Sequence, residues 1–383
     1  MKQKKIGNKL YVFSEEPYII TEDTDVDIIY IQEDVINRFA RINLSLISKM
    51  RPINYHLVCV RKPEWAEYYN YNFELDYLTI KSLSDDNVIK WRQSEEDESI
   101  SFDIQYSTNK IDWMTVTSTS EGQTITTLNK NEIIYIKGNY QPYVEEGYVT
   151  FCNFVTSGEF KVYGNIMSLS NGDDYKNAKT IENDFQFYYL FGRCRSLKDA
   201  SDLILPATTL TEGCYGYMFA FCTSLTTAPE LPATILTERC YISMFSGCTS
   251  LTIAPELPAT TLAEYCYYWM FNGCTSLTSA PELPATTLTQ VCYYGMFENC
   301  SSLTTAPVLP ATTLVSNCYR LMFHNCTSLN SITMLATLIT GLGPLSKWVN
   351  NVAATGTFTK SASMTTLPTG DSGIPSGWTV VDA

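Results

Sequence analysis

The 383-residue chain has little of what catalytic and membrane-spanning proteins are built from. It has two histidines, His56 and His324, and neither a Cys-x-x-Cys pair nor a glycine-rich phosphate loop. None of its apolar runs approaches the roughly 20 residues needed to cross a bilayer. We therefore expect no metal, no cofactor, no membrane insertion and no enzymatic activity. A glycosidase needs only two carboxylates, so 40 acidic residues leave a glycan-degrading protein open as an alternative.

Positive charge is also scarce. Against 40 acidic residues stand 26 lysines and arginines, which gives a net charge of −14, and no lysine occurs between Lys198 and Lys347. This balance opposes binding to a nucleic-acid backbone or an anionic membrane. The basic segment Met1–Leu10 is followed by Tyr11–Glu16 instead of an apolar stretch, so we expect no secretion signal and no lipoprotein box.

What the chain does have is a repeat with a period of 26 residues between Leu205 and Leu329. Each copy carries Leu-Pro-Ala-Thr, Cys-Tyr, Met-Phe and a second cysteine at fixed offsets. The Leu-Pro-Ala-Thr copies begin at Leu205, Leu231, Leu257, Leu283 and Leu309. A constant period with leucine and cysteine at fixed offsets predicts a leucine-rich-repeat solenoid, because each unit is too small to bury its own apolar face.

Ten of the 13 cysteines belong to these repeats. They predict either a disulfide within each coil, such as Cys214 with Cys222, or two ladders of reduced, buried cysteines. We favour the reduced ladders because the total is odd and no export signal is expected.

The rest of the chain divides by pattern into a mainly β protein with short helices. We expect a small α/β or β-rich docking module over residues 1–75 and a β-sandwich-like spacer over 76–169. The solenoid with its N-terminal cap coil should span 170–335, with a polar linker over 171–184 leading into its coils, and a C-terminal cap should span 336–383.

Within one coil, Tyr215, Met218, Phe219 and Cys222 have the i, i+3, i+4, i+7 spacing of a helix face. This spacing predicts a turn or two of helix with these side chains on one face. The other leg contains prolines 229 and 232, which donate no hydrogen bond, so any strand there must be short.

The repeats vary mainly on the face expected to point outward. An unvarying frame with a variable aromatic face is typical of a recognition surface for glycan or protein, although solvent-facing positions also vary without function. We favour recognition most for the cluster of Tyr265, Tyr268 and Trp269. The candidate binding residues are Tyr217, Phe221, Arg239, Tyr265, Tyr268, Trp269, Tyr294, Arg320 and His324.

The segment Met270–Thr278, with close copies on either side, resembles the BspA-like leucine-rich-repeat family of bacterial surface proteins and phage proteins. The resemblance covers about residues 187–335, and Gly356–Lys360 with Ser372–Val380 is similar to the ending common in that family. The resemblance implies adhesion to host matrix, cells or glycans, and it brings no catalytic residues. Residues 1–75 match nothing in the family.

An adhesin of this family should be secreted or lipid-anchored, whereas a phage protein leaves the cell by lysis and needs no signal. We therefore expect a non-enzymatic virion appendage, a head or tail fibre or decoration, assembled in the host cytoplasm. Its partners would be other virion proteins through residues 1–75 and a host-surface glycan or protein through the repeats, and a homo-oligomer is compatible with this. The alternatives are a bacterial cell-surface adhesin and a glycan-degrading appendage.

Overall fold

The computed structural model describes residues 2–6, 9–13, 76–94, 100–145 and 148–383. The chain forms two compact units, residues 1–72 and 73–383. In the first unit, β1 (Lys2–Ile6) and β2 (Lys9–Phe13) form an antiparallel pair, and most of the module expected over residues 1–75 lies outside the described residues.

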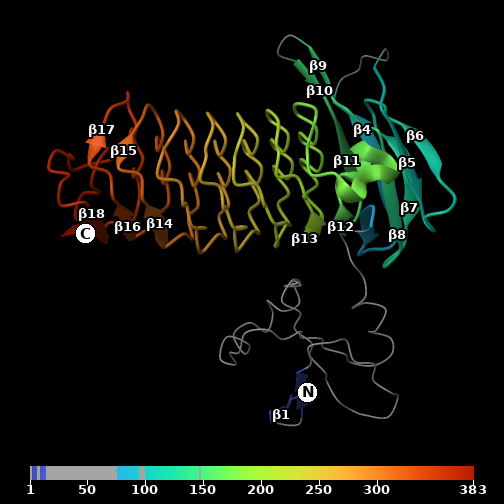
Figure 1. Ribbon diagram of the computed structural model, residues 1–383, viewed down its shortest axis with the longest axis horizontal. Helices are drawn as coiled ribbons and strands as arrows, with labels where there is room; N and C mark the ends of the chain where they lie inside the picture. Colours follow the sequence, from blue (N-terminus) through green and yellow to red (C-terminus); the bar gives the residue numbers. More distant parts are fainter. Residues whose placement is uncertain (1, 7–8, 14–75, 95–99, 146–147) are drawn as a thin grey trace. The chain divides into compact units, whose positions relative to one another are not determined.

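Two β-sheets begin the second unit (Figure 1), one of order β13-β12-β3-β8-β5-β6 and one of order β11-β4-β7. A hairpin of β9 and β10 accompanies them. Along β4, buried and half-buried residues alternate; Trp91 is fully buried and its Nε1 donates to the carbonyl of Phe102 at 3.0 Å. The strands are β3 (Leu78–Ser82), β4 (Asn87–Gln93), β5 (Asp103–Ser107), β6 (Met114–Thr117), β7 (Gln123–Leu128), β8 (Ile133–Gly138), β9 (Tyr143–Glu145), β10 (Tyr148–Thr150), β11 (Cys152–Thr156) and β12 (Phe160–Asn165).

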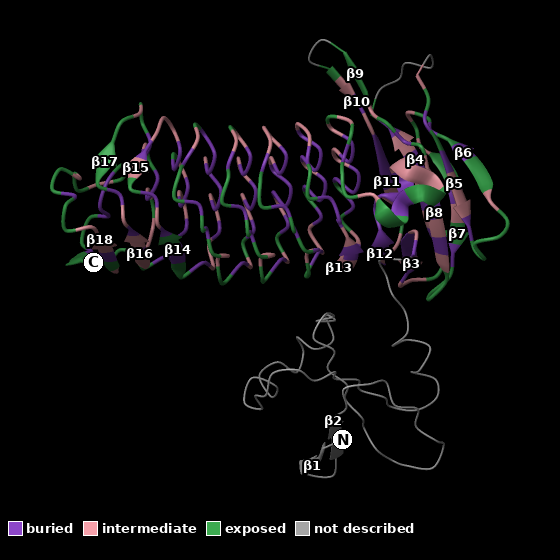
Figure 2. Cartoon of the chain, in the orientation of Figure 1, coloured by how far each residue is buried: buried purple, intermediate pink, exposed green. Residues whose placement is uncertain are grey.

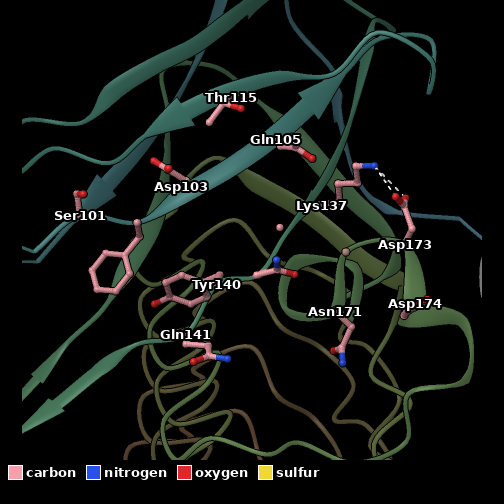
Figure 3. Close-up of a pocket in the computed structure, with 14 residues that line it drawn as sticks. Ser101, Asp103, Gln105, Thr115, Lys137, Tyr140, Gln141, Asn171, Asp173 and Asp174 are labelled. Atoms are coloured by element: carbon pink, nitrogen blue, oxygen red, sulfur yellow. Dashed lines mark hydrogen bonds and ion pairs between the residues drawn. The ribbon is translucent and has the colours of Figure 1, made fainter.

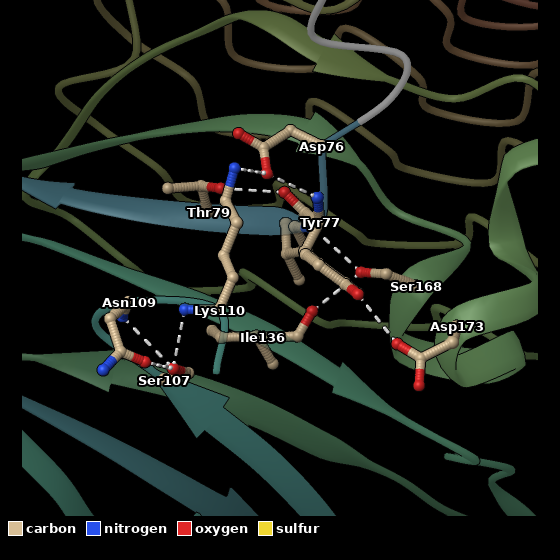
Figure 4. A network of polar contacts seen from close by, with 10 residues as sticks. Asp76, Tyr77, Thr79, Ser107, Asn109, Lys110, Ile136, Ser168 and Asp173 are labelled. Carbon is tan, nitrogen blue, oxygen red and sulfur yellow. Dashed lines mark hydrogen bonds and ion pairs between the residues drawn. The ribbon is translucent and has the colours of Figure 1, made fainter. Parts of the chain in front are cut away.

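A short α-helix, α4 (Ser168–Asn171), and a 3₁₀ helix, η2 (Gly172–Asn177), pack on the larger sheet. The buried Ser168 hydroxyl joins three elements: it accepts from the Leu78 amide at 2.8 Å and donates to the Ile136 carbonyl at 2.7 Å (Figure 4). The expectation of a polar linker over residues 171–184 is wrong, because Tyr175 and Ile181 within it are buried in the core.

The repeats form a β-solenoid with 26-residue coils, which confirms the predicted solenoid (Figure 1). Identical side chains stack in columns along its interior, seen as the buried stripe of every coil in Figure 2. In the phenylalanine column, ring centroids lie 5.5 to 5.8 Å apart and the ring planes are within 8° of parallel. Burying each such ring contributes about 1.5–3 kcal/mol, so stacking supplies the core that a single coil lacks.

The helix predicted over Tyr215–Cys222 is wrong: the segment is a run of stacked turns. The amides of Tyr215, Tyr217, Phe219 and Phe221 donate to carbonyls of the next coil, and those between them mostly donate three residues back. In an α-helix each amide would donate to the carbonyl four residues back, whereas here the amides alternate between a carbonyl three residues back and a carbonyl of the next coil. Tyr217 and Phe221 have φ of 54° and 59°. In this turn segment of every coil, three residues spaced four apart adopt the same left-handed conformation. Among the described residues, α4 is the one α-helix.

The proline-containing leg confirms the prediction of short strands. In the middle coils, neighbouring legs are joined by isolated bridges, for example between Ile253 and Ser279. Regular ladders form near the ends, and β14 is bulged where Pro307 interrupts it. The solenoid strands are β13 (Leu197–Ile204), β14 (Thr305–Leu309), β15 (Thr313–Leu314), β16 (Ser331–Met334), β17 (Leu338–Ile339), β18 (Thr357–Lys360) and β19 (Thr379–Asp382).

The described cysteines are free thiols in the core. In the second column, each Sγ donates to the phenylalanine carbonyl of the preceding coil at 3.0 to 3.2 Å, as Cys248 does to Phe219. Burial raises the pKa of Cys274 to about 12, so the thiol stays protonated and unreactive. Cysteine suits this position because it is small, apolar and able to donate.

The solenoid begins inside the larger sheet, because β13 of its first coil pairs in parallel with β12. Phe154 of β11 also stacks on Phe191, which starts the phenylalanine column, at 5.5 Å. At the other end, Trp348 is fully buried and packs against Phe323. The sheets and the solenoid therefore share one hydrophobic core.

Candidate functional site

In each coil, the middle one of three left-handed turn residues and the residue before it form a corner of the turn segment. The amide of that preceding residue bonds within its own coil, and the side chains on either side of the pair fill the core. We call these corners the outer turn face. Its members, from the first coil onward, are Tyr188 and Tyr189, Gly216 and Tyr217, Ile242 and Ser243, Tyr268 and Trp269, Tyr294 and Gly295, and Arg320 and Leu321; Gly216, Ser243 and Gly295 are buried, and the others are at least partly exposed.

Four predicted aromatic residues meet in one cluster, three of them on this face and Tyr265 at the adjacent corner of its coil. Tyr268 stacks on Tyr294 with centroids 4.8 Å apart and planes at 23°, and it contacts Trp269 at 4.8 Å and Tyr265 at 5.8 Å. All four side chains are half-buried. Burial raises the pKa of Tyr268 to about 12, with contributions from Tyr294 and from Tyr217. The Tyr268 hydroxyl therefore remains a neutral donor at physiological pH.

Two predicted arginines close the ends of this cluster. The Arg239 guanidinium lies 5.2 Å from the centre of the Tyr265 ring, and that of Arg320 lies 5.6 Å from the centre of Tyr294. Arg239 also forms ion pairs with Glu212 of the preceding coil and with Glu238 of its own coil. Such cation–π contacts contribute about 0.5–1 kcal/mol at exposed sites and hold the rings in place.

Within the cluster, Tyr268 and Tyr294 cover one face of each other, and the two arginines lie over the rings of Tyr265 and Tyr294. The Trp269 Nε1 is buried without a hydrogen-bond partner among the described residues, at a cost of about 1–3 kcal/mol. This arrangement suits a partner rich in hydrogen-bonding groups better than one that stacks flat on a tyrosine.

A second aromatic cluster lies at the first coils, where the predictions included only Tyr217. Its ring contacts Tyr188 at 5.4 Å and Tyr189 at 6.4 Å, and both of these contact Phe151, which precedes β11. The sequence did carry a signal for the two missed tyrosines, because they align with the Gly216-Tyr217 pair after a 28-residue step. Phe151 had no such signal.

The remaining two predicted residues are placed differently. Phe221 is 44% exposed at a third corner of its coil and covers Gly247. His324 Nδ1 lies 3.0 Å from Glu298 Oε1, and Asn272 donates to the other oxygen of Glu298 at 3.1 Å. These contacts of Phe221 and His324 are therefore with residues other than the four aromatic side chains of the cluster.

A polar cleft of about 610 Å³ lies between the larger sheet and the α4–η2 segment (Figure 3). One wall is the ion pair between Lys137 and Asp173 at 2.8 Å, and Lys137 also lies 4.2 Å from the centre of the Trp113 ring. The lining mixes donors and acceptors, which suits a small hydroxylated ligand. Among its residues are Asp103, Gln105, Thr115, Asn139, Gln141, Asn171 and Asp174, which come from separate parts of the chain.

Two further properties concern the described residues alone. No group of three or more histidine, cysteine or acidic side chains is placed to hold a metal ion in this part of the chain. The helices found there are all too short or too polar to cross a bilayer.

Comparisons with known proteins identify no relative. The chain matches no protein-family model, no curated protein and no solved structure. The function must therefore be argued from the residues.

Proposed function

We propose that this protein is a non-enzymatic adhesive appendage whose outer turn face binds a glycan or protein on a host cell surface. The aromatic cluster around Tyr268 carries the proposal. Tyrosine, tryptophan and arginine are the residues that dominate binding interfaces, and here Tyr268, Trp269 and Arg320 gather on one half-exposed face.

The repeat frame supports the same proposal. Inside the coils the side chains are nearly identical from one repeat to the next, whereas the outer turn face changes from Gly216-Tyr217 to Ile242-Ser243 and Tyr268-Trp269. A rigid frame that carries variable corners separates stability from recognition, as in other solenoid binding proteins. The sequence resemblance to BspA-like leucine-rich-repeat proteins favours adhesion on independent grounds.

We further propose that the appendage belongs to a phage virion, assembled in the host cytoplasm. In this arrangement residues 1–75 attach to other virion proteins, and the repeats engage the host. The support is the presence of phage proteins in the family that the repeats resemble, together with an N-terminal segment that resembles nothing in it.

Binding of labelled protein to a panel of gut and oral bacteria and to arrayed surface glycans tests the adhesive role. We expect Trp269→Ala to weaken binding by at least about 2 kcal/mol, or roughly 30-fold. Arg320→Glu, a change at an exposed side chain outside the core, should weaken binding and cost no more stability than its cation–π contact with Tyr294 contributes, about 0.5–1 kcal/mol. The matched control is Ile235→Ser, an exposed apolar residue on the proline-containing leg. Equal binding by all of these variants would contradict the proposal.

A further inference from the structure

A second hollow of about 360 Å³ lies where the smaller sheet meets the first coil of the solenoid. Arg92 lies on β4 and Asn153 on β11, and Phe151 directly precedes β11. Tyr189 and Arg193 belong to the first coil of the solenoid. We call it the arginine pocket. It is built from both halves of the second unit, which β12 and β13 join into one sheet.

The pocket holds its two arginines in defined positions. Arg92 and Asn153 are directly opposite on paired strands, and Arg92 Nε donates to Asn153 Oδ1 at 3.2 Å. Asn153 is 2% exposed and its amide nitrogen donates in turn to the Phe154 carbonyl at 3.2 Å. Arg193 occupies a left-handed turn position, with φ of 63°, whose amide bonds to the next coil. Both guanidinium groups are therefore carried on ordered backbone.

The charge of this pair is not balanced within the part of the chain that the structure describes. No carboxylate there forms an ion pair with Arg92 or Arg193, whereas Arg239 pairs with two glutamates. Both positive charges act on Tyr189: burial raises the pKa of its hydroxyl, and Arg193 and Arg92 oppose that rise. Two cations that line one pocket without a carboxylate partner among the described residues, in a chain of net charge −14, call for an anion.

The other lining groups indicate what carries that anion. Phe151 and Tyr189 are tilted against each other with centroids 5.2 Å apart, which provides apolar surface at one side. Ser94, whose Oγ accepts from the Phe151 amide at 3.2 Å, and Asn153 provide hydroxyl and amide groups. This volume and this mixture exceed what a free inorganic ion uses, and they match a sugar ring bearing an anionic group.

We propose that the arginine pocket binds an acidic sugar, with its carboxylate or phosphate held between the guanidinium groups of Arg92 and Arg193. The planar guanidinium fork fits both kinds of oxyanion. The ring would lie against Phe151 and Tyr189. This site is separate from the aromatic cluster, so the proposal does not depend on the adhesive role of Tyr268 and Trp269.

Calorimetric titration of the full chain, in a low-salt buffer free of phosphate, tests the proposal with four probes: glucuronate, glucose 6-phosphate, glucose and inorganic phosphate. We expect one or both anionic sugars to bind, and to bind more tightly than inorganic phosphate, with no heat from glucose. The stronger of the two anionic sugars identifies the oxyanion. Binding should weaken as salt is added.

The variants make the test specific. Arg193→Gln alters an exposed side chain and should weaken sugar binding roughly tenfold or more. Arg92→Lys keeps the charge but loses the fork, and should also weaken it. Arg195→Gln is the matched control, an exposed arginine two residues away that does not line the pocket, and should leave binding unchanged.

Three results would overturn the proposal: no binding of either anionic sugar, equal binding by the Arg193 and Arg195 variants, or inorganic phosphate binding as tightly as the stronger of the two anionic sugars. The acidic run 95–98 follows Ser94 in the sequence and lies outside the described residues, so the titrations are repeated with those four residues changed to their amides. The dependence on Arg193 must persist in that background.

Discussion

Replacing Tyr241 with phenylalanine should stabilise the protein, although tyrosine-to-phenylalanine changes in a core ordinarily cost stability. Tyr241 is 1% exposed and stacks between Tyr215 and Tyr267 at 5.8 and 5.9 Å. Its hydroxyl is buried without a hydrogen-bond partner among the described residues. The substitution removes that one oxygen and leaves the stacked ring unchanged.

The expected magnitude follows from the cost of an unpaired buried hydroxyl, about 1–3 kcal/mol. The void left where the oxygen was has a cost that offsets part of this gain. We therefore expect the free energy of unfolding to rise by roughly 1 kcal/mol. Tyr293 has the same unpaired hydroxyl two coils away, and the double variant should be nearly additive.

Tyr140→Phe provides a matched control of opposite sign. Its hydroxyl, buried in the same unit of the chain, accepts from the Cys152 amide at 2.8 Å. Removing it leaves that amide unpaired and should cost about 1–3 kcal/mol. Urea unfolding followed by circular dichroism measures both variants. If Tyr241→Phe proves as destabilising as Tyr140→Phe, the hydroxyl has a partner, and the account of this column is wrong.

Three other predictions concern the solenoid. Burial raises the pKa of Cys240 from near 9 to about 12, so the folded state holds this proton more tightly than the unfolded state. Stability should therefore be complete below about pH 9 and fall as the pH rises towards 12; a urea midpoint that is constant up to pH 11 would contradict this. Dithionitrobenzoate should label the 12 described cysteines only after unfolding, and rapid labelling of more than one thiol per native molecule would show that the columns are accessible. Gly273→Ala, at φ of 72°, should lower the free energy of unfolding by about 1–2 kcal/mol. Gly247→Ala should lower it further, because the added Cβ would lie 2.6 Å from the Phe221 ring. Equal losses of stability would mean that this ring lies elsewhere.

The solenoid and its inward columns could be predicted because stacking imposes one environment on each offset of the repeat. Leucine, cysteine, methionine and phenylalanine recur where every coil is buried, for example at Met244 and Phe245. The helix prediction failed because stacked turns with a left-handed residue at every fourth position place side chains at nearly the same spacing as a helix. Only hydrogen bonding between coils distinguishes the two, and the spacing within one coil does not contain that information.

Of the two sites, the residues of the aromatic cluster could be picked out from the sequence and those of the arginine pocket could not. Tyr265, Tyr268 and Trp269 stood out because aligned repeats revealed them as departures from a constant frame. Arg92 and Arg193 did not, since they are far apart in the sequence and meet only because β12 pairs with β13. Contacts that depend on such a long-range pairing leave no local pattern.

Mass spectrometry of purified extracellular particles, beside membrane fractions of the same culture, tests the proposed function most directly. The account predicts peptides of this chain at fixed stoichiometry with capsid and tail proteins. Peptides confined to the membrane fraction would contradict it and identify a bacterial surface adhesin instead.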